Sequence, residues 1–311
     1  MPIGETATIP FHPEAPMGAF GVNLYIDRKG KPQQRVQFVA TVVYCGQYMD
    51  EYLIYHLSKT DFVINKNLSD EYLYAMATEC TKAIYPITVL INKTGRLYAM
   101  RTDNIPPRWI EKRKLLEMYY QGEFADNYFN KVEETINNPA KLRKIIEDDL
   151  FFSQLFNITY GKNNMEEIAF ENSLNIIANA APFKYKCTQN IDFDCLHNSE
   201  TDYFDIKHKG ETVDNYETRQ FFKETKGNKT PLKSTYTLTY EIEKTKLDIN
   251  SLTGNFIVKT EEETLMETTL TAYRLYEKPV SQQVDEYLLE AEKQQKRQDN
   301  SFIKSVFKLF N

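Results

Sequence analysis

Two separate parts of the chain have strand-like patterns, residues 21–65 and 234–278, and polar and apolar residues alternate with a period of two in the second part. The second part is the clearer one, because threonine fills much of one face and apolar residues fill the other. Its first apolar face consists of Tyr236, Leu238, Tyr240 and Ile242. The first part contains shorter stretches that are rich in β-branched and aromatic residues. This period is typical of antiparallel strands with one face in water, so we expect two mainly antiparallel sheet regions.

The first sheet region also carries the period of one α-helix. Apolar residues recur at helical spacing after Ser69, at Leu73, Met76, Cys80 and Ile84. Asp70 and Glu71 stand in the first turn, where the helix dipole favours anionic side chains. Residues 85–102 are then expected to form two strands around a turn that contains Gly95.

Helical spacing of apolar residues starts again near residue 106. Pro106 and Pro107 suit the first turn of a helix, because that turn needs no backbone N–H donor. Trp109, the only tryptophan, then lies on the same broad face as Leu116 and Tyr120. We expect this face to pack against the rest of the protein.

Two further stretches are expected to be helical. Residues 138–139 are Asn-Pro, a second helix start signal, and an apolar stripe follows them. The stripe consists of Leu142, Ile145, Ile146 and Leu150. The adjacent acids at 147–149 would point to different sides of this helix, which favours a solvated face over a site. Residues 163–182 also fit a helix by length, although asparagine recurs within them.

Together these patterns predict an α+β fold. It has two mainly antiparallel sheet regions separated by a helical segment, with a C-terminal amphipathic helix. A chain of 311 residues is long enough to bury the core of two lobes. The expected parts are an extended N-terminal arm (1–20), an N-terminal sheet lobe with one helix (21–105), a helical segment (106–182), a C-terminal sheet lobe (183–278) and a C-terminal helical tail (279–311).

One short pattern occurs twice. Residues 91–102, "INKTGRLYAMRT", resemble residues 249–260, "INSLTGNFIVKT", with one extra residue before the Thr-Gly pair in the second copy. An internal duplication would place the two stretches at equivalent positions in superposable sheets. The alternative is convergence, because many hairpins need Asn and Gly in the turn with apolar residues beside it.

Charge and cysteine content limit the partners and the cellular compartment that we expect for this protein. The formal net charge of −6 argues against a main role in binding nucleic acid, which needs a concentrated basic surface. The chain has no run of about eighteen apolar residues, and its first residues lack the pattern of an export signal. Four scattered cysteines make no disulfide framework in a chain of this length. We therefore expect a cytoplasmic protein with reduced thiols.

Candidate chemistry is sparse. The chain lacks the nucleophile, zinc-protease and phosphate-binding motifs of common enzymes, and no cofactor is expected. One Cys/His cluster contains Cys187, Cys195, His197 and His208. Its spacing matches no structural zinc pattern, so no metal is expected there. These observations favour a protein that is not an enzyme.

The end of the chain, residues 301–311, has one apolar helical face. That face consists of Phe302, Ile303, Val306, Phe307 and Phe310, while Lys304 and Lys308 take the opposite side. Eleven residues are too few for a stable isolated helix, so the segment needs a surface to bind. A groove on a partner protein is the preferred surface. The alternatives are the core of this protein and an anionic membrane, which the lysines would favour.

The aromatic content completes the expectation about function. With 21 tyrosines and 19 phenylalanines, the sheets are suited to protein interfaces or ligand grooves. The preferred hypothesis is a non-catalytic interaction component, such as an adaptor, a chaperone or a subunit of a larger assembly. One alternative is a lipid- or peptide-binding module with a curved antiparallel sheet, and a second is an enzyme of unrecognised type. The sequence leaves the oligomeric state open.

Overall fold

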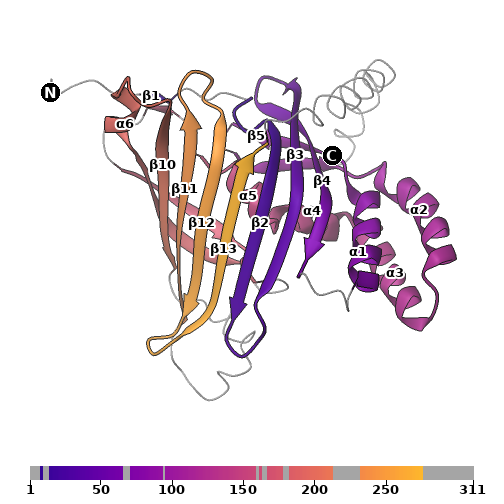
Figure 1. Ribbon diagram of the computed structural model, residues 1–311. Coiled ribbons are helices and arrows are strands. Elements are labelled where there is room, and N and C mark those ends of the chain that lie inside the picture. Colours follow the sequence, from indigo (N-terminus) through magenta and orange to yellow (C-terminus); the bar gives the residue numbers. More distant parts are fainter. Residues whose placement is uncertain are drawn as a thin grey trace.

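Most of the β-strands form one large, curved antiparallel sheet (Figure 1). The computed structural model describes residues 8–9, 14–65, 71–93, 95–158, 161–162, 167–177, 182–212 and 232–275. Within these residues, the eleven strands of the sheet in spatial order are β6 (Leu97–Arg101), β5 (Ile87–Asn92), β4 (Tyr52–Ile64), β3 (Gln34–Tyr48), β2 (Gly18–Arg28), β13 (Thr264–Arg274), β12 (Ile249–Lys259), β11 (Lys233–Glu243), β10 (Tyr203–Thr212), β9 (Phe183–Ile191) and β8 (Ile168–Leu174). A separate ribbon pairs β1 (Thr8–Ile9) with β7 (Gly161–Lys162).

The helices gather on the inner side of the sheet and at one of its ends. They are α1 (Glu71–Ile84), α2 (Ile105–Tyr119), α3 (Glu123–Ile136), α4 (Pro139–Glu147), α5 (Leu150–Leu155) and the short α6 (Phe193–His197). In Figure 1, α4 and α5 lie behind the sheet, whereas α2 and α3 extend to the side beyond α1. Helix α1 contacts β4 and α2, and α3 contacts α2 and α4. None of the described helices is long and apolar enough to cross a bilayer.

The two predicted sheet regions are halves of one sheet, which corrects the expectation of separate sheets. Strand β2 of the first region pairs with β13 of the second, and Leu24 lies opposite Leu270. Hydrophobic periodicity identifies the faces of a strand but not its neighbours, because pairing depends on backbone groups that all strands share. The α+β class and the antiparallel pairing are confirmed.

Two details of the predicted helical segment are wrong. Within 163–182, residues Ile168–Leu174 form edge strand β8, which pairs with β9. The recurrent asparagines lower helix propensity there, and pairing with β9 satisfies the backbone instead. The helix expected after Pro139 is interrupted, because Asp149 is the N-cap of α5 and its side chain accepts a hydrogen bond from the N–H of Phe152. Asp149 is thus largely buried, not part of a solvated face.

The repeated pattern does not mark equivalent positions. Residues 91–102 contain the turn between β5 and β6, and Gly95 in that turn has a φ of 78°. Residues 249–260, in contrast, run through the single strand β12. The second Thr-Gly pair therefore lies inside a strand, where Gly254 faces Leu238 of β11. Convergence explains the resemblance, and the duplication hypothesis is wrong for these segments.

The inner face of the sheet forms the hydrophobic core. All four residues of the predicted face on β11 are at most 2% exposed. Phe151 of α5 contacts the rings of Phe20 and Phe38, with centroid distances of 5.6 and 6.4 Å. On the neighbouring strand, Gly210 leaves room for the ring of Tyr236, which would overlap a Cβ atom at that position. The interior is thus filled by aromatic side chains and by α5.

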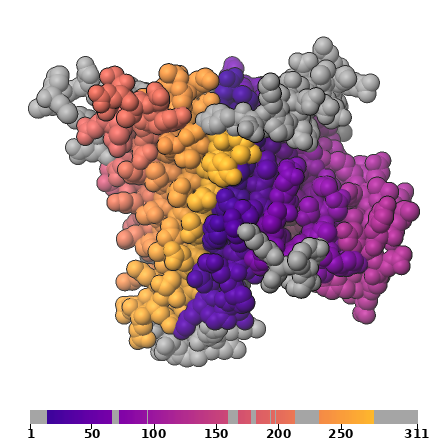
Figure 2. All heavy atoms as spheres, viewed as in Figure 1, coloured from indigo at the N-terminus to yellow at the C-terminus, as the bar shows by residue number. Residues whose placement is uncertain are grey.

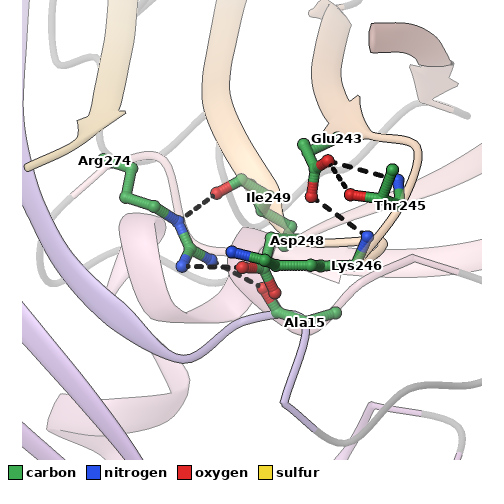
Figure 3. A network of polar contacts seen from close by, with 7 residues as sticks. All are labelled: Ala15, Glu243, Thr245, Lys246, Asp248, Ile249 and Arg274. Atoms are coloured by element: carbon green, nitrogen blue, oxygen red, sulfur yellow. Dashed lines mark hydrogen bonds and ion pairs between the residues drawn. The ribbon is translucent and has the colours of Figure 1, made fainter. Parts of the chain in front are cut away.

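Arg274, the last residue of β13, links Ala15, which precedes β2, to the sheet (Figure 3). Its guanidinium donates hydrogen bonds to the carbonyl oxygens of Ile249 and Ala15, at 2.9 and 3.2 Å, and forms an ion pair with Asp248. The Ile249 N–H donates to the same Ala15 carbonyl. Glu243 closes the turn before Asp248 by accepting a hydrogen bond from the Lys246 N–H at 3.0 Å. The contacts fix the chain where it enters β2.

Candidate functional site

Five large apolar side chains are exposed on α2 and at the beginning of α3. They are Ile110, Leu115, Met118, Tyr119 and Phe124, and each is more than half exposed. We call this group the α2–α3 surface. It contains five of the twelve exposed large hydrophobic residues in the described part of the chain. Single exposed apolar residues are ordinary, whereas several on two consecutive helices make a candidate interaction surface.

Helix α2 is apolar on two opposite sides. Its inner side buries Ile105, Trp109 and Leu116, which confirms the face predicted from the sequence. Its outer side carries Leu115, Met118 and Tyr119, at spacings of three and four residues, where side chains are neighbours on a helix. The exposed part of α2 also carries Glu111, Lys114 and Glu117, so apolar and charged side chains are mixed there.

The turn between α2 and α3 brings the remaining aromatic residue to the same end. Tyr120 leaves the helical conformation, and its N–H still donates to the Leu116 carbonyl at 2.8 Å. Gly122 has a φ of 107°, in the region that favours glycine, and it precedes α3 directly. Phe124 thus stands in the first turn of α3. In Figure 2 this pair of helices projects from one side of the molecule, beside the sheet.

Part-buried and exposed polar contacts hold the two helices together. The indole Nε1 of Trp109 donates to a carboxylate oxygen of Glu133 at 3.2 Å, and the indole ring meets Phe129 edge-on at 6.2 Å. Arg113 forms ion pairs with Glu133 and Glu117 and donates to Asn130 at 3.0 Å. The hydrogen bond from Trp109 and the charge of Arg113 lower the pKa of Glu133. These contacts therefore hold together the two helices that carry the α2–α3 surface.

The charges on α2 and α3 are of both signs. The exposed acids are Glu111, Glu117, Glu123, Asp126 and Glu134, and the exposed bases are Lys114 and Lys131. Helix α1 extends the apolar area, since Tyr72 and Leu73 are exposed and the Tyr72 ring contacts Tyr120 at 5.0 Å.

The curved inner face of the sheet is the second region that could bind a ligand. An apolar cavity of about 10 Å³ lies where Leu53 and Tyr55 of β4 approach Leu155 and Phe156. Pockets for drug-sized ligands occupy roughly 300–1,000 Å³, so this cavity is far too small for a lipid chain. The six residues of α5 occupy the space instead. Its N-terminus is held by an ion pair between Asp149 and Lys59 of β4.

The Cys/His cluster considered in the sequence is dispersed in the structure. Cys187 of β9 accepts a hydrogen bond from the hydroxyl of Tyr236 at 3.2 Å, and His208 of β10 lies 2.8 Å from Gln189 Oε1 through its Nε2. No group of three potential metal ligands gathers anywhere in the described part of the chain. All four cysteines are free thiols, and burial raises the pKa of Cys45 to about 11 and that of Cys80 to about 12.

Buried His208 gives folding stability a defined pH dependence. Burial lowers its pKa to about 3, and its Nδ1 has no hydrogen-bond partner within the described residues. Below pH ~6.5 the histidine of the unfolded chain binds a proton that the folded protein does not bind. This contribution to stability is therefore present above pH ~6.5 and is lost as the pH falls toward the folded-state pKa. His208→Gln should reduce the slope of unfolding free energy between pH 6 and 4 by up to ~1.4 kcal/mol per pH unit. Urea unfolding at each pH measures the slope, and equal slopes would contradict the assignment.

The predicted partner-binding residues of the C-terminal tail lie outside the described residues. This applies to Phe302, Ile303, Val306, Phe307 and Phe310. The sequence analysis did not predict the α2–α3 surface, because only the apolar face of α2 that contains Trp109 was expected to pack. The signal was present, since Leu115, Met118 and Tyr119 repeat at helical spacing.

Comparison with known proteins gives no family assignment. No family model and no curated protein matches the chain. A solved structure that describes lipid–protein interactions in lipovitellin matches 83% of this chain at 11% identity, with a TM-score of 0.40, and the match spans 24% of the lipovitellin chain. A LolA superfamily protein from Nitrosomonas europaea matches 88% of this chain and 91% of its own, at 8% identity and a TM-score of 0.21. Both TM-scores are below 0.5, so neither similarity assigns a fold family.

Proposed function

We propose that the protein is a non-catalytic interaction component that docks another protein on the α2–α3 surface. The observation that carries this proposal is the cluster of five apolar side chains, each more than half exposed, on two helices whose opposite sides are packed. Tyrosine, phenylalanine and methionine are enriched in the centres of protein interfaces. Burying five such side chains would contribute on the order of 8–15 kcal/mol before ordering costs.

The titratable groups of the interior support a role without catalysis. The buried thiols have raised pKa values, and burial lowers the pKa of both His56 and His208. These groups therefore keep one protonation state near neutral pH, whereas general acids and bases work best with a pKa near the operating pH. Cys80 and His208 are packed in the core, and Cys45 and His56 are partly buried.

Site-specific photo-crosslinking tests the proposal. Photoreactive p-benzoylphenylalanine would replace Tyr119 in the full chain, and irradiation would be carried out in cells of the native host. A matched control places the same group at Tyr273, an exposed tyrosine on β13. We expect position 119, and not position 273, to capture one defined protein in good yield. Equal and diffuse capture from both positions would end the proposal.

A second candidate function is the binding of an apolar peptide or lipid by the curved sheet. The observation that favours it is that an aromatic inner face encloses a six-residue helix, α5, which contributes Phe151, Phe152 and Leu155. A ligand could take this space only if α5 moved out, since the cavity beside α5 has a volume of about 10 Å³. Titration with a fluorescent fatty acid tests this candidate, with saturable binding of one molecule per chain as its requirement.

A further inference from the structure

We propose that Lys59 of β4 is the head-group site for a fatty-acid carboxylate, and that the acyl chain takes the place of α5 against the inner face of the sheet. The inference rests on the second candidate function, the binding of an apolar ligand by the curved sheet. It adds the chemical class of the ligand and the residue that recognises its head group.

Lys59 places a positive charge in an apolar part of the interior. Its side chain is 9% exposed, and the residue lies opposite Ala40 of β3, which is fully buried. The Lys59 ammonium lies over the rings of Phe38 and Phe152, at 4.1 and 5.1 Å from their centroids. Among the described residues, Lys59 is the one lysine or arginine in the core. Lysine is rarely buried without a paired anion, so the interior requires an anion at this position.

Helix α5, which now supplies that anion, has the chemistry of an anionic amphiphile. Asp149 provides a carboxylate at its start, and the apolar side chains of Phe151, Phe152 and Leu155 follow, each at most 2% exposed. A fatty acid has the same order of groups, a carboxylate followed by a hydrocarbon. It can therefore replace both the ion pair with Lys59 and the apolar contacts of α5, while Asp149 returns to water.

Polar contacts hold both ends of α5 to the sheet. Asp149 pairs with Lys59 at the start of the helix, and the Tyr240 hydroxyl of β11 donates to the Gln154 carbonyl at 2.7 Å near its end. Six residues are too few for a stable isolated helix, so the position of α5 depends on these contacts and on its packing. Displacement of α5 would open an apolar space ~9 Å long between Lys59 and Tyr240.

The charge of Lys59 discriminates between apolar ligands. A neutral ligand in the place of α5 would leave the ammonium buried without a partner, and a cationic ligand would add repulsion. A carboxylate at the same position keeps the charge paired. The interior should therefore prefer an anionic amphiphile over a cationic one with the same hydrocarbon chain.

Isothermal titration calorimetry of the full chain tests this preference at neutral pH. The probes are dodecanoate and dodecyltrimethylammonium, both below the concentrations at which they form micelles. We expect one dodecanoate per chain, bound at least tenfold more tightly than the cation. Because this comparison uses the unaltered chain, it does not depend on the folding of any variant.

Substitutions at the ion pair assign the preference to Lys59. Asp149→Asn removes the competing carboxylate and should tighten dodecanoate binding at least tenfold. Lys59→Met with Asp149→Asn leaves no unpaired charge in the interior and should bind both amphiphiles with affinities within about threefold of each other. Asp148→Asn, which breaks the exposed ion pair with Lys144, should bind dodecanoate as the parent protein does. Circular dichroism confirms that each variant is folded.

Hydrogen exchange measured by mass spectrometry tests the displacement of α5. Bound dodecanoate should make the amides of residues 150–156 exchange faster, since the helix leaves the sheet. Unchanged or slower exchange in these residues would overturn the displacement.

The outcomes separate this inference from the proposed functions. Equal affinity for the two amphiphiles, or a double variant that keeps the preference for dodecanoate, would overturn the role of Lys59. The binding of an apolar ligand by the sheet would still stand in that case. If neither amphiphile binds, the second candidate function fails together with the inference. Docking at the α2–α3 surface is tested separately, by crosslinking from position 119.

Discussion

Asp149→Asn is expected to lower the free energy of unfolding by about 3–5 kcal/mol, because it leaves the charge of Lys59 buried without its partner. The side chains of Lys59 and Asp149 are only 9% and 12% exposed. The Lys59 ammonium lies over the rings of Phe38 and Phe152, at 4.1 and 5.1 Å from their centroids. Asparagine can still cap α5 through its side-chain oxygen, so the substitution isolates the lost charge from the lost cap.

Urea unfolding measures this effect against a neighbouring control. Asp148→Asn removes the exposed ion pair with Lys144 and should change stability by less than about 0.5 kcal/mol. The double variant Lys59→Met with Asp149→Asn should recover most of the loss, since no unpaired charge then remains inside. A change below about 1 kcal/mol for Asp149→Asn would show that water reaches the pair. The position of α5 would then be determined by its aromatic contacts alone.

Local periodicity predicted the helices and strands that bury only one of their sides. The helix with Met76 and Cys80 on its inner side is α1, and both side chains are at most 3% exposed. The alternation through Tyr236 and Tyr240 is β11, with the predicted side inward. In each case one repeated spacing identifies the buried side, although Leu73, at the start of the predicted stripe on α1, is 39% exposed.

Long-range pairing could not be predicted in the same way. The sequences of β2 and β13 do not indicate that Val22 lies opposite Ala272, because the backbone hydrogen bonds that pair strands are the same for all residue types. Strand β8 was missed for a related reason, since its pairing with β9 outweighs its own weak preference. The sequence also did not predict that Asp149 is buried. Three adjacent acids suggest a solvated helix, and the partner of Asp149, Lys59, stands 90 positions away in the sequence.

The predicted contact surface remains a prediction. The sequence placed an apolar contact surface on the tail residues Phe302 to Phe310, which lie outside the described residues. The α2–α3 surface emerged only once the structure showed which side of α2 is packed. A helix with apolar residues on both sides does not reveal, from sequence, which side faces water.

Leu115→Glu with Met118→Glu should weaken capture of the partner at least 100-fold while the protein stays folded. Each substitution replaces an apolar side chain whose burial contributes about 1.5–3 kcal/mol with a carboxylate that would have to lose its water in the interface. Both side chains are already more than half exposed, so the melting temperature should change by less than about 3 °C.

The most direct test of the docking role is therefore quantitative crosslinking from position 119 in native cells, with and without these two substitutions. The amount of partner captured is measured by mass spectrometry, and Met49→Glu serves as the control at an exposed methionine elsewhere. The α2–α3 surface predicts near-complete loss of capture for the pair and full capture for Met49→Glu. Undiminished capture by a folded Leu115→Glu, Met118→Glu protein would contradict it.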